Sequence, residues 1–378
     1  MIIDEWSEVQ LHTWIELAQW KLVGVIFIIV GDADGQRKPI FDRWQDAMDA
    51  KDIRRSQLIH ELCGGLCVSL TEYRRGTDQE LFDMYTGLYA HADDDSQVPG
   101  IVEHLRGIYP YPNSKKCDHF FVISHKKRMI LNHAMNWLVA DDHTDIEFIP
   151  SFGEKPGMTM QPQDMIIWKG MQLLCYSRRY AKNSPVTGAV YVIEDFDGSR
   201  ITIRLHEDYT GASLIVPPAE IAEEAEDEDD AASDAEALED VGDNAEDKGS
   251  TMEIRQVRKD DGTVVKKPFY RLSYKRASEI LRPQFALVYA SIQGRTMKGS
   301  VALMDLDNPN MPVRDVITAM SRPTTGTDLH FVTQRQQRDM FEHIENRCAH
   351  NEFDLRKRVN ESKARPPSER PTPSRIGR

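Results

Sequence analysis

Two adjacent carboxylates, Asp4 and Glu5, follow the apolar residues that open the sequence. An apolar stretch of this kind is typical of a buried strand, which places both side chains at the strand's carboxyl end. There an aspartate can hold Mg²⁺ through its hydration shell, and the neighbouring glutamate can orient or deprotonate an attacking water. A solvated turn is the simpler interpretation of an isolated acidic pair, because most such pairs lie at the surface.

A helix and a second strand follow the acidic pair. Apolar residues recur at the spacing of one helix face, at Leu11, Trp14, Ile15, Ala18 and Leu22. The apolar run at 25–30 then predicts a buried strand that ends at Gly31 and Asp32, and Gln36 comes shortly after it. Polar residues at the ends of two successive strands favour a functional site over a solvated surface.

The stretch 285–332 has the same alternating character. Three apolar runs predict buried strands, at 285–289, 301–304 and 329–332. The turn at 293–296 is expected to open a short helix, and a second helix is expected to carry Ser321 and Arg322 at its end. Strands that alternate with helices predict a parallel sheet covered on both faces, with functional groups on the loops at strand ends. An ordinary α/β turn with a surface arginine is the alternative.

Five short segments carry a family resemblance. DEWS at 4–7 resembles motif II, GDADGQ at 31–36 resembles motif III, and LTEYR at 70–74 resembles motif IV. QGRT at 293–296 is similar to motif V, and SR at 321–322 is similar to motif VI. In this order the segments resemble the motifs of superfamily 1 helicases, specifically the RecD-like branch. Members of that family are ATP-driven motors that move along single-stranded DNA and unwind duplexes.

The resemblance implies roles for individual residues. It implies a catalytic set made up of Asp4, Glu5, Gln36, Arg74 and Arg322. In this set Asp4 holds Mg²⁺ through its shell, and the two arginines stabilise charge on the γ-phosphate of ATP. The implied nucleotide contacts are Asp32 and Gly294. The implied DNA contacts are Ser291, Gln293 and Thr296.

Two motifs depart from the family pattern. The family's motif III reads GDxxQ, whereas Gln36 stands one position later in this sequence. In motif V, Val288, Ala290 and Ser291 stand where the family usually has Thr, His and Lys. Ser291 still offers a hydroxyl that can hydrogen-bond to a phosphate.

The fold that the resemblance implies is α/β, with a RecA-like parallel-sheet motor domain, an inserted small β-barrel and a partial first RecA-like domain. Residues 1–50 are expected to end the first RecA-like domain, and 51–160 and 263–350 are expected to form the second. Short strands are expected at 165–168, 171–177, 188–196, 199–205 and 213–216. They are similar to the Src-homology-3-like barrel of RecD-like helicases, here over 161–218, which in that family can line the single-strand channel.

Charge separates two further segments from the rest. The formal charge of the chain is -14, but residues 220–247 hold 15 acidic residues and no Lys or Arg, so the other residues together carry +1. We expect 219–262 to be an acidic disordered linker, because charge repulsion and a lack of apolar side chains oppose folding. Residues 351–378 are expected to be a disordered basic tail able to contact phosphates or an acidic partner.

The sequence contains no GxxxxGK[ST] loop to hold the phosphates of ATP. We therefore expect the chain to be the carboxyl-terminal part of a helicase and inactive alone. ATP and Mg²⁺ would be its cofactors once the missing segment is supplied, on the same chain or by a second polypeptide. The expected partner is single-stranded DNA or a single/double-strand junction. A non-catalytic nucleic-acid-binding remnant and a structural protein with charged arms are the alternatives.

Cysteine usage and hydropathy indicate the compartment. The five cysteines form no CxxC pair, which suits a reducing compartment and predicts neither a zinc site nor a disulfide framework. The longest apolar run, at 23–30, is too short to span a bilayer, and no signal peptide is evident. We expect an intracellular protein, in the cytoplasm or nucleus, without a membrane partner.

Overall fold

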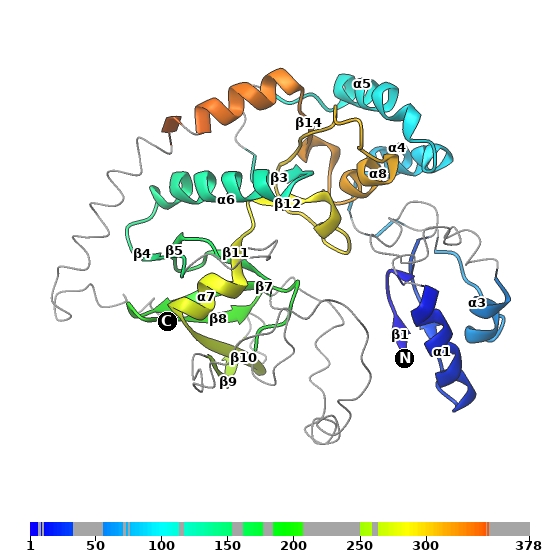
Figure 1. Ribbon diagram of the computed structural model, residues 1–378, viewed down its shortest axis with the longest axis horizontal. Coiled ribbons are helices and arrows are strands. Elements are labelled where there is room, and N and C mark those ends of the chain that lie inside the picture. The colour runs from blue at the N-terminus through cyan, green and yellow to red at the C-terminus, as the bar shows by residue number, and fades with distance from the viewer. Residues whose placement is uncertain are drawn as a thin grey trace. The chain divides into compact units, whose positions relative to one another are not determined.

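The computed structural model describes residues 1–6, 9, 11–32, 56–70, 73–74, 76–112, 117–152, 162–176, 184–206, 250–258, 264–344 and 346–347. The chain divides into two compact units (Figure 1). The first unit comprises Met1–Leu131 and Phe285–Arg347, and the second comprises Asn132–Gln284 and Cys348–Arg378. The second unit is therefore largely an insertion between two parts of the first.

A four-stranded parallel sheet forms the centre of the first unit, in the order β12-β3-β13-β14. Its strands are β3 (His119–Val122), β12 (Ala286–Val288), β13 (Val301–Leu303) and β14 (Leu329–Phe331). Almost every strand residue is buried, as parallel strands covered on both faces require. The α/β class and the parallel sheet expected from the alternation of strands and helices are confirmed.

The helices of the first unit come from both of its chain segments. α4 (Gln79–Gly87) and α5 (Val98–Ile108) follow each other, with the short η2 (Leu88–His91) and η3 (Asp95–Gln97) between them. α8 (Val313–Met320) connects β13 to β14 and is buried along its whole length. η6 (Gly326–Asp328) precedes β14, and a helix at 334–344 follows it.

A smaller parallel pair carries the acidic residues of the amino-terminal segment. β1 (Ile2–Ile3) pairs with β2 (Ile28–Ile29), and α1 (Leu11–Leu22) connects them, as the apolar pattern predicts. The buried side chains of this part form one cluster with α3 (Gln57–Leu62), made up of Trp6, Trp14, Leu17, Phe27 and Leu62. The cluster holds the end of β1 in a fixed position relative to α1.

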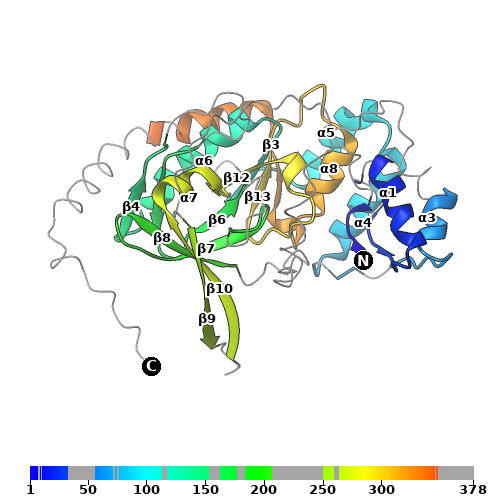
Figure 2. The same cartoon turned by 60° about the horizontal axis from the view of Figure 1, so that its bottom comes forward.

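The second unit contains a six-stranded antiparallel sheet in the order β11-β6-β7-β8-β10-β9. Its strands are β6 (Gln172–Cys175), β7 (Val190–Phe196), β8 (Arg200–Leu205), β9 (Ser250–Arg258), β10 (Val264–Ser273) and β11 (Leu281–Pro283). α7 (Tyr274–Ile280) connects the last two strands, and α6 (His125–Ala140) crosses from the first unit into the second. β9 and β10 project beyond the other strands (Figure 2).

The structure corrects the expected boundaries of the insertion. β9 lies inside the range 219–262 that we expected to be a disordered linker, and β10 and β11 belong to the antiparallel sheet instead of the motor domain. Residues 251–257 form a strand because they pair along nearly the whole length of β10. Among the described strands no ladder joins the outer strands β11 and β9, so the sheet is not shown to close into a barrel. Residues 219–249, 351–378 and the strand expected at 213–216 lie outside the described residues.

The first of the expected barrel strands also belongs elsewhere. β5 (Met165–Trp168) pairs with β4 (Ile146–Ile149) in a separate antiparallel ribbon. The buried Asn136 side chain fixes it there, because it donates to the Ile166 carbonyl and accepts from the Ile166 N–H, both at 2.8 Å. No helix in the described part of the chain is long and apolar enough to cross a bilayer.

Candidate phosphoryl-transfer site

Glu5 has a strained backbone directly after β1. Its φ is 53°, and Asp305 is the one other non-glycine residue with a positive φ among the described residues. The Asp4 carboxylate accepts the Glu5 N–H at 2.9 Å, which supports the turn. A non-glycine residue in this conformation costs about 1–3 kcal/mol, and such residues gather at functional sites. The structure therefore places the acidic pair at a strand end, as the sequence predicts.

The turn at 293–296 contacts Glu5, although 288 residues separate Glu5 from Gln293. The Gln293 side-chain amide donates to Glu5 Oε2 at 3.0 Å. Gly294 has a φ of 72°, and a Cβ added there would lie 3.7 Å from Glu5 Oε1. Gln293 thus holds the orientation of the glutamate expected to act on water. A role of Gln293 in binding DNA stays a prediction.

The helix expected to begin at this turn is absent. η5 (Tyr289–Ser291) precedes the turn, and residues 293–300 contain no helix. The left-handed conformation of Gly294 accounts for this, since an α-helix cannot continue through a residue with positive φ. Instead of a helix, the turn presents the Gln293 side chain and the Gly294 backbone to Glu5.

Arg322 lies against the other side of the same turn. Its side chain is buried, with 5% of the residue exposed. The guanidinium donates to the Arg295 carbonyl at 3.1 Å, to the Thr318 carbonyl at 2.9 Å and to the Ser321 hydroxyl at 2.7 Å. The Arg322 carbonyl accepts the Met297 N–H at 2.9 Å. Arg322 therefore holds the conformation of the 293–297 turn through side chain and backbone together.

Arg74 lies in an exposed segment just before α4. Two contacts join this segment to the residues that follow Arg322. A Cβ on Gly76 would clash with the Thr324 carbonyl oxygen, so the two backbones are in direct contact there. Asp78 then accepts the Gly326 N–H at 2.7 Å. The two arginine-bearing segments are thus held together near α4.

Asp78 has two functions in this arrangement, and the sequence interpretation did not include it. One carboxylate oxygen caps α4 by accepting the Leu81 N–H at 2.9 Å, and the other accepts from Gly326. Hydrogen bonds from Leu81 and Gly326 lower the pKa of Asp78, because they favour the ionised carboxylate. An aspartate before a helix is a recognisable cap signal, but its contact with the distant Gly326 has no sequence signal.

The other predicted site residues lie as follows. The Ser291 hydroxyl donates to the Val288 carbonyl at 2.9 Å, at the end of η5. Thr296 is exposed, and Asp32 is half-buried just after β2. Gln36 lies outside the described residues. The structure therefore brings together Glu5, the 293–297 turn and Arg322, and the functional roles of all the predicted site residues stay predictions.

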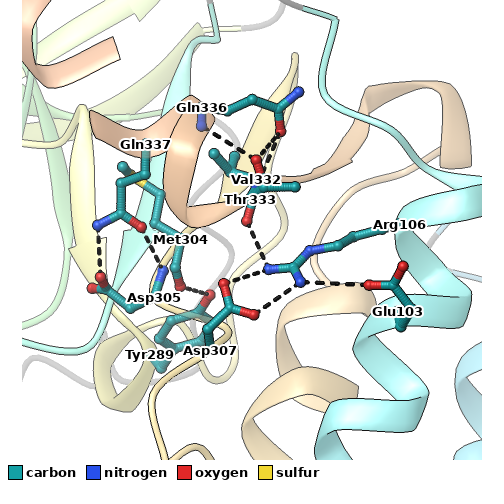
Figure 3. A network of polar contacts seen from close by, with 10 residues as sticks. All are labelled: Glu103, Arg106, Tyr289, Met304, Asp305, Asp307, Val332, Thr333, Gln336 and Gln337. Atoms are coloured by element: carbon teal, nitrogen blue, oxygen red, sulfur yellow. Dashed lines mark hydrogen bonds and ion pairs between the residues drawn. The ribbon is translucent and has the colours of Figure 1, made fainter. Parts of the chain in front are cut away.

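A network of polar contacts joins the carboxyl ends of β13 and β14 to α5 (Figure 3). Arg106 forms two hydrogen bonds with the Asp307 carboxylate, at 2.9 and 2.7 Å, and a third with the Val332 carbonyl at 3.2 Å. Paired bonds between a guanidinium and a carboxylate fix both position and angle. This network secures α5 against the edge of the central sheet.

A second part of the network surrounds Asp305. Its carboxylate accepts from the Ile123 N–H at 3.1 Å and from the Gln337 amide at 2.8 Å, and it pairs with Lys127. The Asp305 N–H in turn donates to the Gln337 side chain at 3.0 Å (Figure 3). These contacts account for the positive φ of Asp305, because three elements hold the residue in place.

The acidic pair also fits the expected metal. Mg²⁺ usually keeps several waters and binds through one or two carboxylates and the phosphates of its substrate. The exposed Asp4 at the end of β1 matches this donor set. Among the described residues no group of three or more His, Cys, Asp or Glu side chains forms a closed metal site. Asp4 would contribute one carboxylate to such a metal, with water and phosphate as its other ligands.

Comparison with known proteins gives the following results. No protein-family model and no curated protein matches the sequence. Solved structures similar to the chain include the Pif1 helicase from Candida albicans, with a TM-score of 0.49 at 15% identity over 92% of this chain and 76% of that one. Pif1 from Bacteroides bound to single-stranded DNA gives a TM-score of 0.45 at 14% identity, over 89% and 71% of the two chains.

Pif1 from Bacteroides in complex with ADP-AlF3 and single-stranded DNA gives a TM-score of 0.46 at 13% identity, over 91% of this chain and 75% of that one. A functional assignment for the present chain rests on its own residues and their geometry.

Proposed function

We propose that the chain is the carboxyl-terminal part of an ATP-dependent DNA helicase or translocase of superfamily 1, of the RecD-like branch. The observation that carries the proposal is the turn at 293–297, which contacts Glu5 on one side and Arg322 on the other. At this turn the segment after β1 meets the end of α8, in the positions expected of a general base and an arginine finger on either side of motif V. An ordinary surface arginine would not be buried against such a turn.

In this proposal Asp4 holds Mg²⁺ through water, and Glu5, oriented by Gln293, positions the attacking water. Asp32, Gly294 and Gln36 contact the nucleotide or sense its γ-phosphate. The nucleotide competes with the Arg295 carbonyl and the Ser321 hydroxyl for the guanidinium of Arg322. The guanidinium leaves these neutral acceptors for the phosphate because charge develops there during transfer.

Arg74 acts as the second arginine of the site. It is exposed, and Asp78 and Gly76 tie its segment to the residues after Arg322. A movement of one arginine-bearing segment is therefore transmitted to the other.

Single-stranded DNA or a single/double-strand junction is the proposed partner, and Ser291, Gln293 and Thr296 are its proposed contacts. Hydroxyls at Ser291 and Thr296 suit phosphate oxygens. The antiparallel sheet of the second unit is proposed to serve as the Src-homology-3-like wall of the strand channel. An intracellular location, in the cytoplasm or nucleus, is part of the proposal.

ATP turnover requires a phosphate-binding loop that these 378 residues do not contain. We expect the purified chain to hydrolyse ATP negligibly, because that loop provides most of the triphosphate's binding. The decisive experiment mixes the chain with a polypeptide that carries the missing loop and measures ATP hydrolysis with and without single-stranded DNA. The expected result is strand-stimulated turnover that Glu5→Gln abolishes.

Two outcomes would contradict the proposal. Robust turnover by the chain alone would show that phosphate binding does not depend on the missing loop. Turnover of the mixture that survives Glu5→Gln would remove the general base from the mechanism. Binding of single-stranded DNA without turnover in any mixture would favour the alternative, a non-catalytic nucleic-acid-binding remnant of a helicase.

A further inference from the structure

One face of the antiparallel sheet in the second unit has a hollow of about 320 Å³, lined by side chains from β7, β8, β9 and β10. The hydrophobic core lies on the opposite face, where Ile201, Ile203 and Leu272 are completely buried. Side chains alternate between the two faces of a strand, so Arg200 and Arg271 lie on the outer face. The volume falls within the usual range of small-ligand sites, about 300–1,000 Å³.

Arg255 forms the floor of the hollow together with an aromatic ring. Its guanidinium carbon lies 4.9 Å from the centroid of the Phe269 ring, in a cation–π contact. One of its terminal nitrogens donates to Glu253 at 2.9 Å. Two contacts thus hold the guanidinium plane in place, and in the described part of the chain its other N–H groups have no acceptor, so they can bind a ligand.

Arg271 is held in the same manner by a carboxylate. One of its terminal nitrogens donates to Asp197 at 2.6 Å. Asp197 also accepts the N–H groups of Ser199 and Arg200, at 3.1 and 2.9 Å. Burial raises the pKa of Asp197, but the hydrogen bonds from Arg271, Ser199 and Arg200 outweigh it and lower the pKa to about 2. Asp197 therefore stays ionised and anchors Arg271 throughout the neutral range.

Both ion pairs are half exposed and can share their cations with a ligand. The side chains of Arg255 and Glu253 are 46% and 64% exposed, and those of Arg271 and Asp197 are 52% and 43% exposed. Pairs of this kind contribute little to stability, about 0–1 kcal/mol, so a phosphate can bind without a large loss. Arg200 lines the same hollow, and in the described part of the chain no carboxylate pairs with its side chain.

We propose that this hollow binds a nucleotide unit, with its phosphate on Arg271 and Arg200 and its base stacked on the outer face of the Arg255 guanidinium. Bases stack readily on guanidinium planes as well as on aromatic rings. The unit is either a free nucleotide or one residue of a single strand, since both present the same phosphate and base. The site lies entirely within the second unit, and as a strand contact it rests on the proposed function, in which this sheet borders the strand.

The mixture of charges in the hollow selects this ligand over a simple polyanion. Asp195, Asp197 and Glu253 line it together with the three arginines, so it has no large positive field. A nucleotide offers a phosphate to the arginines and base N–H groups to a carboxylate such as Glu253. Inorganic phosphate and peptides of Asp and Glu have no base to stack on Arg255, and their binding is expected to be weaker.

The test uses the full chain and a short fluorescein-labelled oligothymidylate, whose binding is followed by fluorescence anisotropy at several salt concentrations. Arg255→Ala and Arg271→Ala are each expected to weaken binding about five-fold or more, in line with the loss of one stacked base or one phosphate contact. Lys275→Ala is the matched control, because Lys275 is exposed on α7, carries the same charge and does not line the hollow.

Competition distinguishes the two sources of the ligand. If adenosine monophosphate displaces the strand from the natural chain but not from Arg255→Ala, a free nucleotide is sufficient for binding to the hollow. If the arginine variants bind the strand more weakly but the monophosphate does not compete, the ligand of the hollow is a nucleotide within a strand. Competition by inorganic phosphate at the same concentration as the monophosphate would overturn the proposal.

A local measurement covers variants that fold poorly. Ultraviolet crosslinking of a strand that contains 5-iodouracil to the unmodified chain, read by mass spectrometry, is expected to label peptides from 190–206, 250–258 or 264–273. Crosslinks confined to other peptides would overturn the proposal. Arginine variants that bind as tightly as the natural chain, or no more weakly than Lys275→Ala, would overturn it as well. Neither result bears on the strand-stimulated turnover by which the proposed function is judged.

Discussion

Replacement of Arg322 by alanine tests whether its side chain holds the turn at 293–297 in place. The guanidinium is buried and donates to the Arg295 and Thr318 carbonyls and to the Ser321 hydroxyl. We expect Arg322→Ala to destabilise the first unit before any nucleotide is involved. A finger arginine that simply projected into solvent would have no such effect.

The size of the effect follows from the acceptors that lose their donor. The Thr318 carbonyl keeps a second donor, the Ser321 hydroxyl at 2.9 Å, and loses only part of its hydrogen bonding. The Arg295 carbonyl loses the guanidinium that holds the turn. A hydrogen bond from a charged donor contributes about 1.5–3 kcal/mol, and an acceptor left unsatisfied costs about 1–3 kcal/mol. We therefore expect the free energy of unfolding to fall by about 2–4 kcal/mol, a large share of the usual 5–15 kcal/mol.

Urea unfolding of the full chain, followed by tryptophan fluorescence, measures this change. Arg322→Lys is expected to lose less, because an ammonium group keeps the charge and reaches one of the acceptors. Arg335→Ala is the control, since its side chain is 88% exposed and lies 4.0 Å from Asp339, at the limit of an ion pair. It removes the same charge and is expected to change stability by less than about 0.5 kcal/mol.

The two roles of Arg322 separate in a reconstituted enzyme. Loss of a finger arginine is expected to lower turnover by about three to five orders of magnitude, more than a modest loss of stability can explain under folding conditions. If Arg322→Ala unfolded at the same urea concentration as the natural chain, the reasoning from its buried hydrogen bonds would be refuted. If it retained turnover near that of the natural chain, the assignment to motif VI would fail.

Two further substitutions test the contacts that support the site. Asp78→Ala is expected to cost about 2 kcal/mol through the lost helix cap and the lost bond to Gly326, whereas Asp78→Asn keeps the cap and costs less. Because hydrogen bonds lower the folded pKa of Asp78, its carboxylate stabilises the protein above the unfolded pKa of about 4 and loses this contribution as pH falls through the folded value. Urea titrations at a series of pH values should show the gap between Asp78→Asn and the natural chain closing in acid, and a constant gap would contradict this. Arg106→Ala should lower the free energy of unfolding by about 2 kcal/mol in the same assay, because it removes the paired bonds to Asp307. Glu103→Ala is the control, since Glu103 also pairs with Arg106 but its side chain is 81% exposed. An effect of Arg106→Ala no larger than that of Glu103→Ala would contradict the prediction.

The sequence alone determined the α/β class and most of the elements around the site. Apolar runs of strand length predicted the positions of β12, β13 and β14, and the spacing of apolar residues predicted α1. These features are readable because the period of a strand or helix is a local property of the chain. The acidic pair after β1 was readable for the same reason, since it follows an apolar strand directly.

Two other local predictions failed, each for a different reason. The helix expected after Gln293 does not form, because Gly294 takes a positive φ that ends a helical conformation. The strand β9 was missed because an acidic, low-complexity composition precedes it and because it forms by pairing with β10. Strand formation depends on the partner strand more than on the strand's own residues.

Only the tertiary structure decided how the functional side chains meet. The contact between Gln293 and Glu5, the burial of Arg322 against Arg295, and the bond between Asp78 and Gly326 each join residues from distant parts of the chain. The hollow around Arg255 depends likewise on four strands whose order in the sheet differs from their order in the sequence. Such contacts have no periodic signal, because they are set by how elements pack and by which buried polar groups need a partner.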